Sequence, residues 1–450
     1  MLLSSVRSQS VEEKRPNIIL FLADDLGYGD LACYNKDGLR TPAIESIAKQ
    51  GVRFTSFYSN GPESSPTRTA LLTGRYQQRV GGLECAIGSG NVGRYDDAIR
   101  LRETNDLGLP VRETSIARIL KEAGYNTAIC GKWHLGYEEK FSPNLHGFDY
   151  AFYGLGGDMD YFHHMEKPPL PLHILYENGK PVKRDGYITD LIGEQSVKFL
   201  DAQSIMKPFL LYVPFTAPHA PYQGPGDYLP AILPESSVLW DQSKGPLSVY
   251  QSMIRRMDET IAKILAKLKE KGMSENTIVI FMSDNGGTTS GNNSPLNGFK
   301  GNLFEGGIRV PCVVKWPGKI PAGSVSEQPG MTFDLSLSLV KAAGASIPEN
   351  RSFDGIDILK HIGENQPVQD RSLFWRARRG STTRKAVRSG DLKYIWLNNN
   401  GNISEYLFDL GDDLSEKTNL INSRQDDVTK LKTFLDTWEK EGPGKEWALD

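Results

Sequence analysis

Cysteine is scarce in this sequence, and long apolar segments are missing. Four cysteines occur in 450 residues without C-x-x-C spacing, which is too few for a disulfide scaffold or a cysteine-based zinc site. The longest apolar runs, Asn17–Ala23 and Thr277–Met282, are far shorter than the roughly 20 residues of a membrane-spanning helix. We therefore expect no membrane partner.

An excess of charge of one sign is also absent. The 52 lysines and arginines nearly balance the 55 aspartates and glutamates, and the net charge is −3. Non-specific binding to nucleic acid or to anionic lipid needs a basic surface, which this balance does not supply. We expect no nucleic-acid partner.

The first fifteen residues lack the apolar stretch of about 7–15 residues that marks a secretory signal. We interpret residues 1–15 as a leader or the remnant of one, and no signal peptide is recognised. The rest of the chain has no internal repeat and no low-complexity tract. Its length suits one large domain and a smaller companion.

Strand-like and helix-like segments alternate from residue 16 to about residue 346. Helical spacing of apolar residues, followed by glycine, predicts helices over 42–50, 113–123 and 250–268. Apolar runs typical of buried strands occur at Asn17–Ala23, Val52–Ser59, Asn126–Cys130, Phe209–Phe215 and Thr277–Ser283. The alternation predicts an α/β domain at 16–346, with a large doubly wound, mostly parallel sheet flanked by helices.

The pattern changes after residue 346. Short strand-like pieces separated by turns occur at 373–375, 385–388, 392–397 and 405–410. A last helix begins near Ser423, and its inward face carries Val428, Leu431, Leu435 and Trp438. Residues 347–450 are therefore predicted to form a smaller α+β domain built on an antiparallel sheet.

Acidic residues directly follow two of the predicted strands. Asp24 and Asp25 follow the first strand, and Asp284 and Asn285 follow the last strand of the large domain. Ligands of an open parallel sheet bind at the carboxyl ends of its strands, so these side chains are expected to converge. Clustered carboxylates need a neutralising cation, and oxygen ligands favour a hard ion. The pattern predicts a Ca²⁺ or Mg²⁺ site, although acidic residues also end strands without a metal.

A hydroxyl and several cations follow the other predicted strands. Ser64 stands where a turn enters a helix, and a helix N-terminus favours bound anions. Arg68 adds a planar fork of donors that suits a tetrahedral oxyanion. Further candidates, after strands or in a glycine-flanked loop, are Lys132, His134, His219 and Lys300. Each alone is typical of a structural or solvated side chain, but together they indicate a hydrolase of anionic esters.

These segments resemble those of the type I, formylglycine-dependent sulfatases of the alkaline phosphatase superfamily. The segment SSPTRTALLTGR at residues 64–75 is similar to the family signature Cys/Ser-x-Pro-x-Arg…Leu-Thr-Gly-Arg. Similar segments follow in the family's order: GKWHLG at 131–136, PH at 218–219, SDNG at 283–286 and EGGIRVP at 305–311. The resemblance covers about Pro16 to the C-terminal helix and implies a sulfuric ester hydrolase of the bacterial carbohydrate sulfatase type.

By position, the resemblance implies that Ser64 is the residue converted to formylglycine. The maturing partner would be a formylglycine-generating or a serine-type enzyme. One Ca²⁺ is implied, with Mg²⁺ as the second choice, held by Asp24, Asp25, Asp284, Asn285 and residue 64. The family also implies a periplasmic or secreted location.

The same resemblance implies a set of side chains around the sulfate group: Arg68, Lys132, His134, His219 and Lys300. In the family's chemistry, one hydroxyl of the hydrated aldehyde attacks sulfur. Deprotonation of the second hydroxyl, the role implied for His134, then expels sulfate. His219 and Lys300 stand where the family protonates or stabilises the leaving alkoxide.

The serine at position 64 departs from the cysteine that most family members carry there. Three explanations stay open: a natural serine matured by a radical anaerobic enzyme, an engineered Cys-to-Ser change that traps substrate, and an unmodified member that works otherwise. A plain serine could form a sulfate ester, but it has no second hydroxyl for its elimination.

Two long polar connections, 83–110 and 154–190, contain aromatic residues that suit sugar rings. Ordinary solvated loops have a similar composition. The candidates for substrate binding in these loops are Arg94, Asp158, Asp160, His163 and His164. Family members with such loops most often act on sulfated galactans such as carrageenans, or on glycosaminoglycans, and we expect a galactose-type sulfated saccharide as the substrate.

Two rival hypotheses stay open. Phosphate and sulfate esters share a tetrahedral shape, so a phosphate or phosphonate ester hydrolase of the same superfamily is one rival. Phosphatases of that superfamily usually need two zinc ions, whereas the acidic cluster here suits one hard ion. The other rival is a non-catalytic protein that binds sulfated glycans and leaves Ser64 unmodified.

Overall fold

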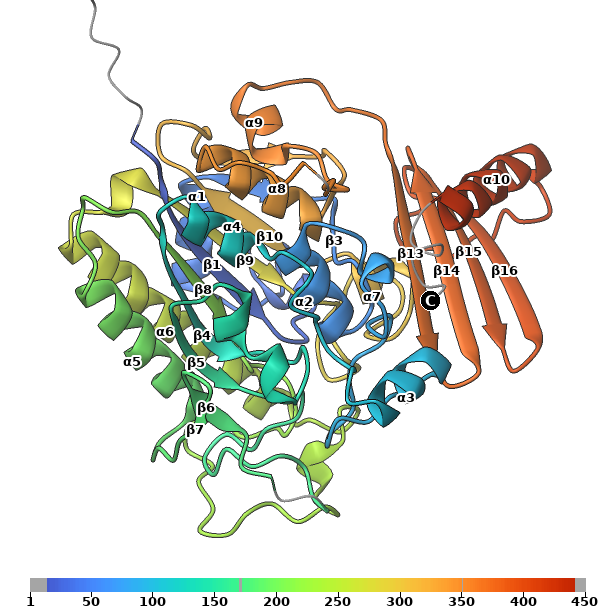
Figure 1. The fold of residues 1–450 in the computed structure, drawn as a ribbon. Helices are drawn as coiled ribbons and strands as arrows, with labels where there is room; N and C mark the ends of the chain where they lie inside the picture. The colour runs from blue at the N-terminus through green and yellow to red at the C-terminus, as the bar shows by residue number, and fades with distance from the viewer. Residues whose placement is uncertain (1–13, 170–171, 350, 442–450) are drawn as a thin grey trace, which may run out of the picture.

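The computed structural model describes residues 14–169, 172–349 and 351–441. Figure 1 shows a large sheet between layers of helices, and a small sheet with α10 packed against it. Within the described part of the chain, no helix has the length and apolarity needed to cross a membrane. Residues 1–13, which make up most of the predicted leader, lie outside the described residues.

The large sheet has ten strands in the order β11-β2-β10-β9-β1-β8-β4-β5-β6-β7. Its central strands β9, β1, β8, β4 and β5 are parallel, while β10, β6 and β7 pair in an antiparallel manner. The mostly parallel sheet is therefore confirmed, with antiparallel strands towards its edges. The strands are β1 Asn17–Ala23, β2 Val52–Phe54, β4 Asn126–Lys132, β5 Tyr150–Gly154, β6 Leu175–Glu177, β7 Lys180–Pro181, β8 Phe209–Pro214, β9 Thr277–Ser283, β10 Cys312–Lys315 and β11 Ser324–Ser326.

Helices cover both faces of the large sheet. One layer contains α6, which packs against α5 and α1, and the other contains α8, which packs against α2, α4 and α9 (Figure 1). The helices are α1 Pro42–Lys49, α2 Ser64–Thr73, α3 Asp96–Glu103, α4 Ile116–Glu122, α5 Ile188–Asp201, α6 Leu247–Glu270, α7 Glu305–Ile308, α8 Thr332–Ala342, α9 Ile358–Gly363 and α10 Gln425–Glu441. The alternation of strands and helices along the chain gives this doubly wound arrangement.

Two central strands match the sequence prediction residue for residue, whereas β4 ends two residues later than predicted and β8 ends one residue earlier. Strands β1 and β9 have the predicted bounds, and all residues of both strands are buried. They pair in parallel, with Ala23 opposite Ser283. Since both faces of a central parallel strand are covered by helices, the unbroken apolar runs of the sequence are explained.

One predicted strand is wrong in its extent. The segment Val52–Ser59 forms two short strands, β2 and β3 (Phe57–Tyr58), which belong to different sheets. Strand β2 pairs with β10 and β11, whereas β3 pairs with β12 (Gly330–Met331) and forms one isolated bridge, from Tyr58 to Arg309. The two residues between β2 and β3 redirect the chain towards α2, so the apolar run satisfies two separate pairings.

The C-terminal sheet is an antiparallel meander of β13 Ser372–Arg379, β14 Thr382–Ser389, β15 Leu392–Asn399 and β16 Asn402–Asp409. Its strands are longer than the predicted pieces. Asn400 and Gly401 connect β15 to β16, and both have positive φ, as a two-residue hairpin turn requires. Helix α10 packs on β14 and β15, and its predicted inward residues are buried. The antiparallel sheet is confirmed, while the domain boundary at 346/347 stays a prediction.

Candidate active site

The acidic cluster lies where β1 and β9 end side by side. Asp24, Asp25, Asp284 and Asn285 are all buried, with exposed fractions of 0–1%. The backbone N–H of Asp25 donates to Asp284 Oδ1 at 3.2 Å, and Asn285 Nδ2 donates to Asp25 Oδ1 at 2.8 Å. The parallel register thus brings together the four residues that the sequence proposes as metal ligands.

The cluster offers oxygen atoms that are free to accept a cation. Asn285 Oδ1 is buried and has no hydrogen-bond partner among the described residues. Asp24, Asp25 and His219 each place one ligand atom within 4.8 Å of the others. Buried carboxylates and an orphaned amide oxygen fit a hard cation such as Ca²⁺. The residues present therefore fit the metal that the family uses.

Each carboxylate of the cluster also has a cationic neighbour. Arg68 NH2 lies 2.9 Å from Asp284 Oδ2 and 3.6 Å from Asp24 Oδ1, and Lys132 Nζ contacts Asp24. Lys300 Nζ lies 2.8 Å from Asp25 Oδ2. Three carboxylates and three fixed cations balance, so a bound divalent ion would leave the pocket positive. A positive buried pocket attracts an anionic substrate.

Asp24 illustrates how the cations act on the carboxylates. Burial alone would raise the pKa of Asp24, but Lys132, His219 and Arg68 together hold its pKa below the ordinary value. The carboxylate therefore stays ionised and available as a ligand.

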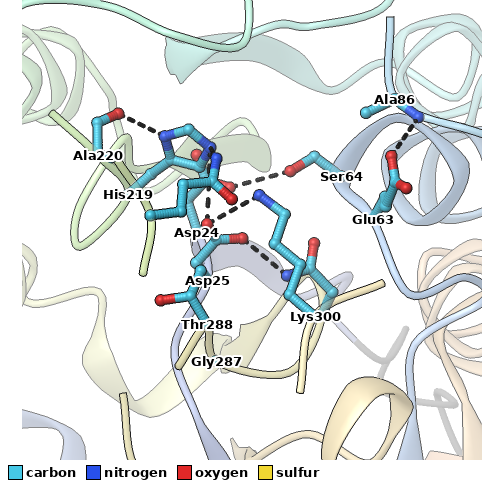
Figure 2. Close-up of polar contacts among 12 residues, drawn as sticks. Asp24, Asp25, Glu63, Ser64, Ala86, His219, Ala220, Gly287, Thr288 and Lys300 are labelled. Carbon is cyan, nitrogen blue, oxygen red and sulfur yellow. Dashed lines mark hydrogen bonds and ion pairs between the residues drawn. The ribbon is translucent and has the colours of Figure 1, made fainter. Parts of the chain in front are cut away.

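Ser64 is the first residue of α2, as the sequence predicts for a hydroxyl at a helix N-terminus. Its Oγ donates a hydrogen bond to Asp24 Oδ1 at 3.0 Å, and its exposed fraction is 1%. Figure 2 shows Ser64 pointing at Asp24, with Lys300 reaching Asp25. The N-terminus of this ten-residue helix favours negative charge developing at the residue.

His134 follows β4 in a strained left-handed conformation, with φ of 57°. Its Nε2 lies 2.7 Å from the carbonyl oxygen of Ile87, so Nε2 carries the proton and donates. Its buried Nδ1 has no hydrogen-bond partner in the described chain. Burial, and then the charge of Lys132, hold the pKa of His134 well below its ordinary value. His134 is therefore a neutral imidazole with a free lone pair, which is the state of a general base.

Gly157 makes room for this imidazole. A Cβ atom at position 157 would lie 2.6 Å from the ring atoms Cε1 and Nε2 of His134. The close approach requires glycine at this position.

His219 faces the cluster from the loop after β8. Its Nδ1 lies 2.5 Å from the carbonyl oxygen of Ala220, to which it donates (Figure 2). Its Nε2 lies 3.1 Å from Gln242 Nε2, 3.6 Å from Asp25 Oδ2 and 3.7 Å from Asp158 Oδ1. Of the substrate-binding candidates, Asp158 is thus brought directly to the catalytic cluster.

The other loop candidates have different surroundings. Asp160 accepts hydrogen bonds from the backbone N–H groups of Phe162 and His163, at 2.9 and 2.6 Å. His163 Nε2 contacts the carbonyl oxygen of Leu229, and His164 Nε2 contacts that of Gly186. Asp160 and His164 hold backbone of their own loop, whereas His163 holds backbone of the connection after β8. Their predicted role in substrate binding stays a prediction.

Arg94 lies on the opposite loop. A Cβ atom at Gly88 would lie 3.0 Å from Arg94 Nε, so the guanidinium stands over the backbone that follows Ile87. Its predicted role also stays a prediction.

Three residues of this region were not predicted from the sequence. Gln242 contacts His219, Glu63 occupies the N-cap position of α2 without a side-chain capping bond, and Arg379 of β13 pairs with Glu63. Gln242 stands in a long connection without periodicity, and Arg379 stands in a strand of the other sheet. Neither position carries a sequence signal that links it to the site.

The comparisons with known proteins agree with this geometry. The profile of the Sulfatase family matches residues 16–345, and that of the C-terminal region of N-sulphoglucosamine sulphohydrolase matches residues 299–440. The N-acetylgalactosamine-6-sulfatase of Mus musculus is 34% identical over 398 residues, covering 85% of this chain and 72% of that protein. Arylsulfatase J of Mus musculus is 33% identical over 358 residues, covering 78% of this chain and 56% of that protein.

Solved structures show the same fold. Ps i-CgsB, in complex with k-i-k-neocarrahexaose, superposes with a TM-score of 0.80 at 31% identity, covering 94% of this chain and 92% of that one. The PsFucS1 sulfatase from Pseudoalteromonas sp. gives a TM-score of 0.74 at 26% identity, covering 97% of this chain and 92% of that one. With the family profile spanning most of the chain, this protein belongs to the sulfatase family and is a sulfuric ester hydrolase.

Proposed function

We propose that this sulfatase removes sulfate from a galactose-type unit of a sulfated polysaccharide such as a carrageenan. Two similarities support this substrate. One relative is named for N-acetylgalactosamine 6-sulfate, and one similar structure holds a neocarrahexaose. The observation that carries the chemistry is the Ser64 hydroxyl at the N-terminus of α2, hydrogen-bonded to Asp24 inside a buried cluster of cations.

In this proposal, the fixed cations bind the sulfate group. Arg68, Lys132 and Lys300 are held by carboxylates, so they keep their positions while charge moves onto the sulfuryl oxygens. Preorganised cations in a water-poor pocket lower the barrier without reorganising. A cation bound by Asp24, Asp25, Asp284 and Asn285 would add Lewis-acid stabilisation of the same charge.

The two histidines move protons on either side of the reacting group. His219 Nε2 lies between Asp25 and Asp158, and when the ring is protonated there it gives a proton to the departing sugar oxygen. We assign to the free Nδ1 of His134 the proton that leaves the nucleophile in the second half of the reaction. Formylglycine at position 64, once hydrated, supplies the second hydroxyl that this half-reaction requires.

The test combines intact mass with a turnover assay. The chain should be produced with and without a serine-type maturing enzyme and assayed on galactoside sulfates, aryl sulfates and aryl phosphates. We expect loss of two hydrogen atoms at Ser64 in the matured chain, together with release of inorganic sulfate. Faster hydrolysis of phosphate esters would favour the phosphatase alternative, and binding without turnover by the matured chain would favour the glycan-binding protein.

The same experiment separates the three explanations for the serine. If only the matured chain turns over, serine is the natural precursor. If no maturing enzyme acts on it, and Ser64→Cys in a host with the aerobic enzyme restores activity, the serine replaces a natural cysteine. Turnover by plain serine would point to an unmodified mechanism. A periplasmic or secreted location belongs to this proposal as well.

A further inference from the structure

Strand β13 of the C-terminal sheet runs along the start of the catalytic helix α2. Trp375 Nε1 donates to the carbonyl oxygen of Ser59 at 2.8 Å, and Arg379 NH1 lies 3.0 Å from Glu63 Oε1. These residues stand four positions apart, so they share one face of the strand. Phe374, of the other face, stacks on Trp438 of α10. The face of β13 that carries Arg379 is therefore the one turned towards residue 64.

A second arginine stands on the same face. Arg384 of β14 is paired in register with Ala377, and Ala377 is two positions before Arg379. Arg379 and Arg384 are thus diagonal neighbours on the side of the sheet that faces α2. Burial, and then the nearby charge of Arg379, lower the pKa of Arg384, while Glu63 raises it. The two guanidinium groups therefore lie close enough to repel each other.

Around Glu63 and Arg379, the positive charge of the side chains exceeds the negative charge. Glu63, whose side chain is 6% exposed, pairs with Arg379 and also accepts the backbone N–H of Ala86 at 3.0 Å (Figure 2). Its pKa is held down, against burial, by Arg379, Arg94 and Lys300. Among the described residues, neither Arg94 nor Arg384 has a carboxylate within ion-pair distance. The backbone N–H of Gly380, next to Arg379, donates to the carbonyl oxygen of Arg94 at 2.6 Å. Two carboxylates, those of Glu63 and Asp158, thus face three guanidinium groups.

The neighbouring arginines of β13 show that this excess is local. Arg376 makes a two-pronged pair with Glu84, at 2.7 and 2.8 Å, and Arg378 pairs with Asp96 and Asp97. Their charges are matched by carboxylates of the catalytic domain. Arg379 is paired on one side only, and its side chain is 46% exposed. An open guanidinium next to a buried catalytic residue is available to a ligand.

We propose that Arg379, Arg384 and Arg94 form a second anion-binding subsite, which recognises a further negative group of the substrate beside the sulfate that is removed. Guanidinium groups bind sulfate and carboxylate with paired hydrogen bonds, so the group is a second sulfate ester or a uronic-acid carboxylate on the same or the next sugar. This inference rests on the proposed function, since it deepens the substrate of that site. It makes the C-terminal sheet part of substrate selection.

The test measures binding to the full chain with plain Ser64 by isothermal titration calorimetry. Three probes are compared: a galactoside with one sulfate, the same galactoside with two sulfates, and a galactoside sulfate linked to a uronic acid. We expect one of the two doubly charged probes to bind about tenfold or more tightly than the singly charged probe, because a charge-assisted hydrogen bond is gained. Which probe gains affinity distinguishes sulfate from carboxylate.

The variants are Arg384→Gln and Arg379→Gln, with Arg378→Gln as the matched control on the same strand. Both subsite variants should bring the affinity ratio close to one, whereas Arg378→Gln should keep it. Circular dichroism and thermal unfolding check that each variant is folded. If Arg379→Gln unfolds because Glu63 loses its partner, the affinity ratio measured for Arg384→Gln alone tests the subsite.

The outcomes separate this inference from the proposed function. Equal affinity for one and two charges, or a ratio that survives Arg384→Gln, overturns the subsite even if the matured chain releases sulfate. A ratio that depends on Arg384 supports the subsite even if the matured chain does not turn over. Failure to bind any of the three probes overturns both.

Discussion

The catalytic cluster and the rim around it are built in different ways. The cluster is formed by residues at or shortly after the ends of β1, β4, β8 and β9, by Ser64 and Arg68 of α2, and by Lys300, so regular elements fix most of their positions. The rim comes from the loops 83–110 and 154–190 and from the C-terminal sheet, and its side chains are held by contacts between distant segments. In the proposed function, the chemistry is therefore assigned to residues that the sheet and α2 position, and substrate selection to the loops and the C-terminal sheet.

The largest expected effect concerns residue 64, at the centre of the cluster. With plain Ser64, confirmed by mass, the chain should bind sulfated saccharide and complete no multiple turnovers, because no second hydroxyl is present to release sulfate. Calorimetry measures the binding, and sulfate release measures the turnover. Hydrolysis by the plain serine form at the rate of the matured form would contradict the formylglycine mechanism.

The second-largest effect is expected from removal of the metal. Dialysis of the matured enzyme against a calcium chelator should abolish turnover and lower the melting temperature, because the buried carboxylates lose a ligand that binds only the folded state. Added Ca²⁺ should restore both quantities better than Mg²⁺, and metal analysis should find one ion per chain. Full activity after exhaustive chelation would show that the acidic cluster is structural.

His134→Ala should lower turnover by about 10²–10⁴-fold, because a general base is lost. The first half-reaction does not need this base, so a sulfated form of the enzyme should accumulate and be visible by mass spectrometry. His134 is already neutral because its pKa lies well below the ordinary value, so the wild-type rate should not fall near pH 6.5 through this residue. Absence of the adduct would remove His134 from its assigned role.

Arg68→Ala and Lys300→Ala form a matched pair within the cluster. Each should lower turnover by about 10²–10³-fold, because a fixed cation is lost at the sulfuryl group. Arg68 has no exposed surface, so Arg68→Ala should also cost about 3–5 kcal/mol of stability by leaving the buried Asp284 without its cationic partner, while Asp24 keeps Lys132. Lys300, 13% exposed, should cost less. Chemical denaturation compares the two, and equal losses of stability would contradict this reasoning.

The smallest effect on turnover is expected on the rim, at Glu166. Its carboxyl accepts the hydroxyl of Tyr137 and the backbone N–H of Gly90 at 3.0 Å, which ties the two long loops together. Burial raises the pKa of Glu166 from 4.5 to about 7. The stability that the protonated form contributes is therefore fully present below about pH 4.5 and is lost as the pH rises through about 7.

Glu166→Gln should remove the loss of stability at rising pH, because the amide does not ionise. Relative to wild type, the variant should gain about 1–3 kcal/mol of stability between pH 5 and pH 8, with turnover changed by less than about threefold. Denaturation at both pH values gives the difference. A gain that does not depend on pH would mean that Glu166 does not titrate in this range.

Much of the cluster could be predicted from the sequence because the end of a buried strand is visible as the end of an apolar run. Asp24 and Asp284 follow apolar runs whose bounds are those of β1 and β9, and parallel pairing brings such ends together. Ser64 could be placed at a helix start because the preceding turn is rich in glycine and proline. These inferences need only local patterns and one rule of topology.

The rim could not be predicted in the same way. Whether Asp158 turns towards His219 while His163 turns towards Leu229 depends on how a loop of nearly forty residues closes, and composition does not determine this. The pair Arg379–Glu63 joins residues 316 positions apart, one in the C-terminal sheet and the other at the start of α2. The prediction of one strand over Val52–Ser59 was wrong for a related reason, because the two halves of this apolar run pair with different partners.

The hydrogen bond between Trp375 and Ser59 has a consequence for how the protein folds during its synthesis. It also joins residues 316 positions apart, so the wall beside residue 64 cannot close until the ribosome has made most of the chain. At about 5–20 residues per second, this interval lasts on the order of tens of seconds. If residue 64 is modified as proposed, the modifying enzyme would reach it more easily during that time than afterwards, since the finished fold leaves only 1% of Ser64 exposed.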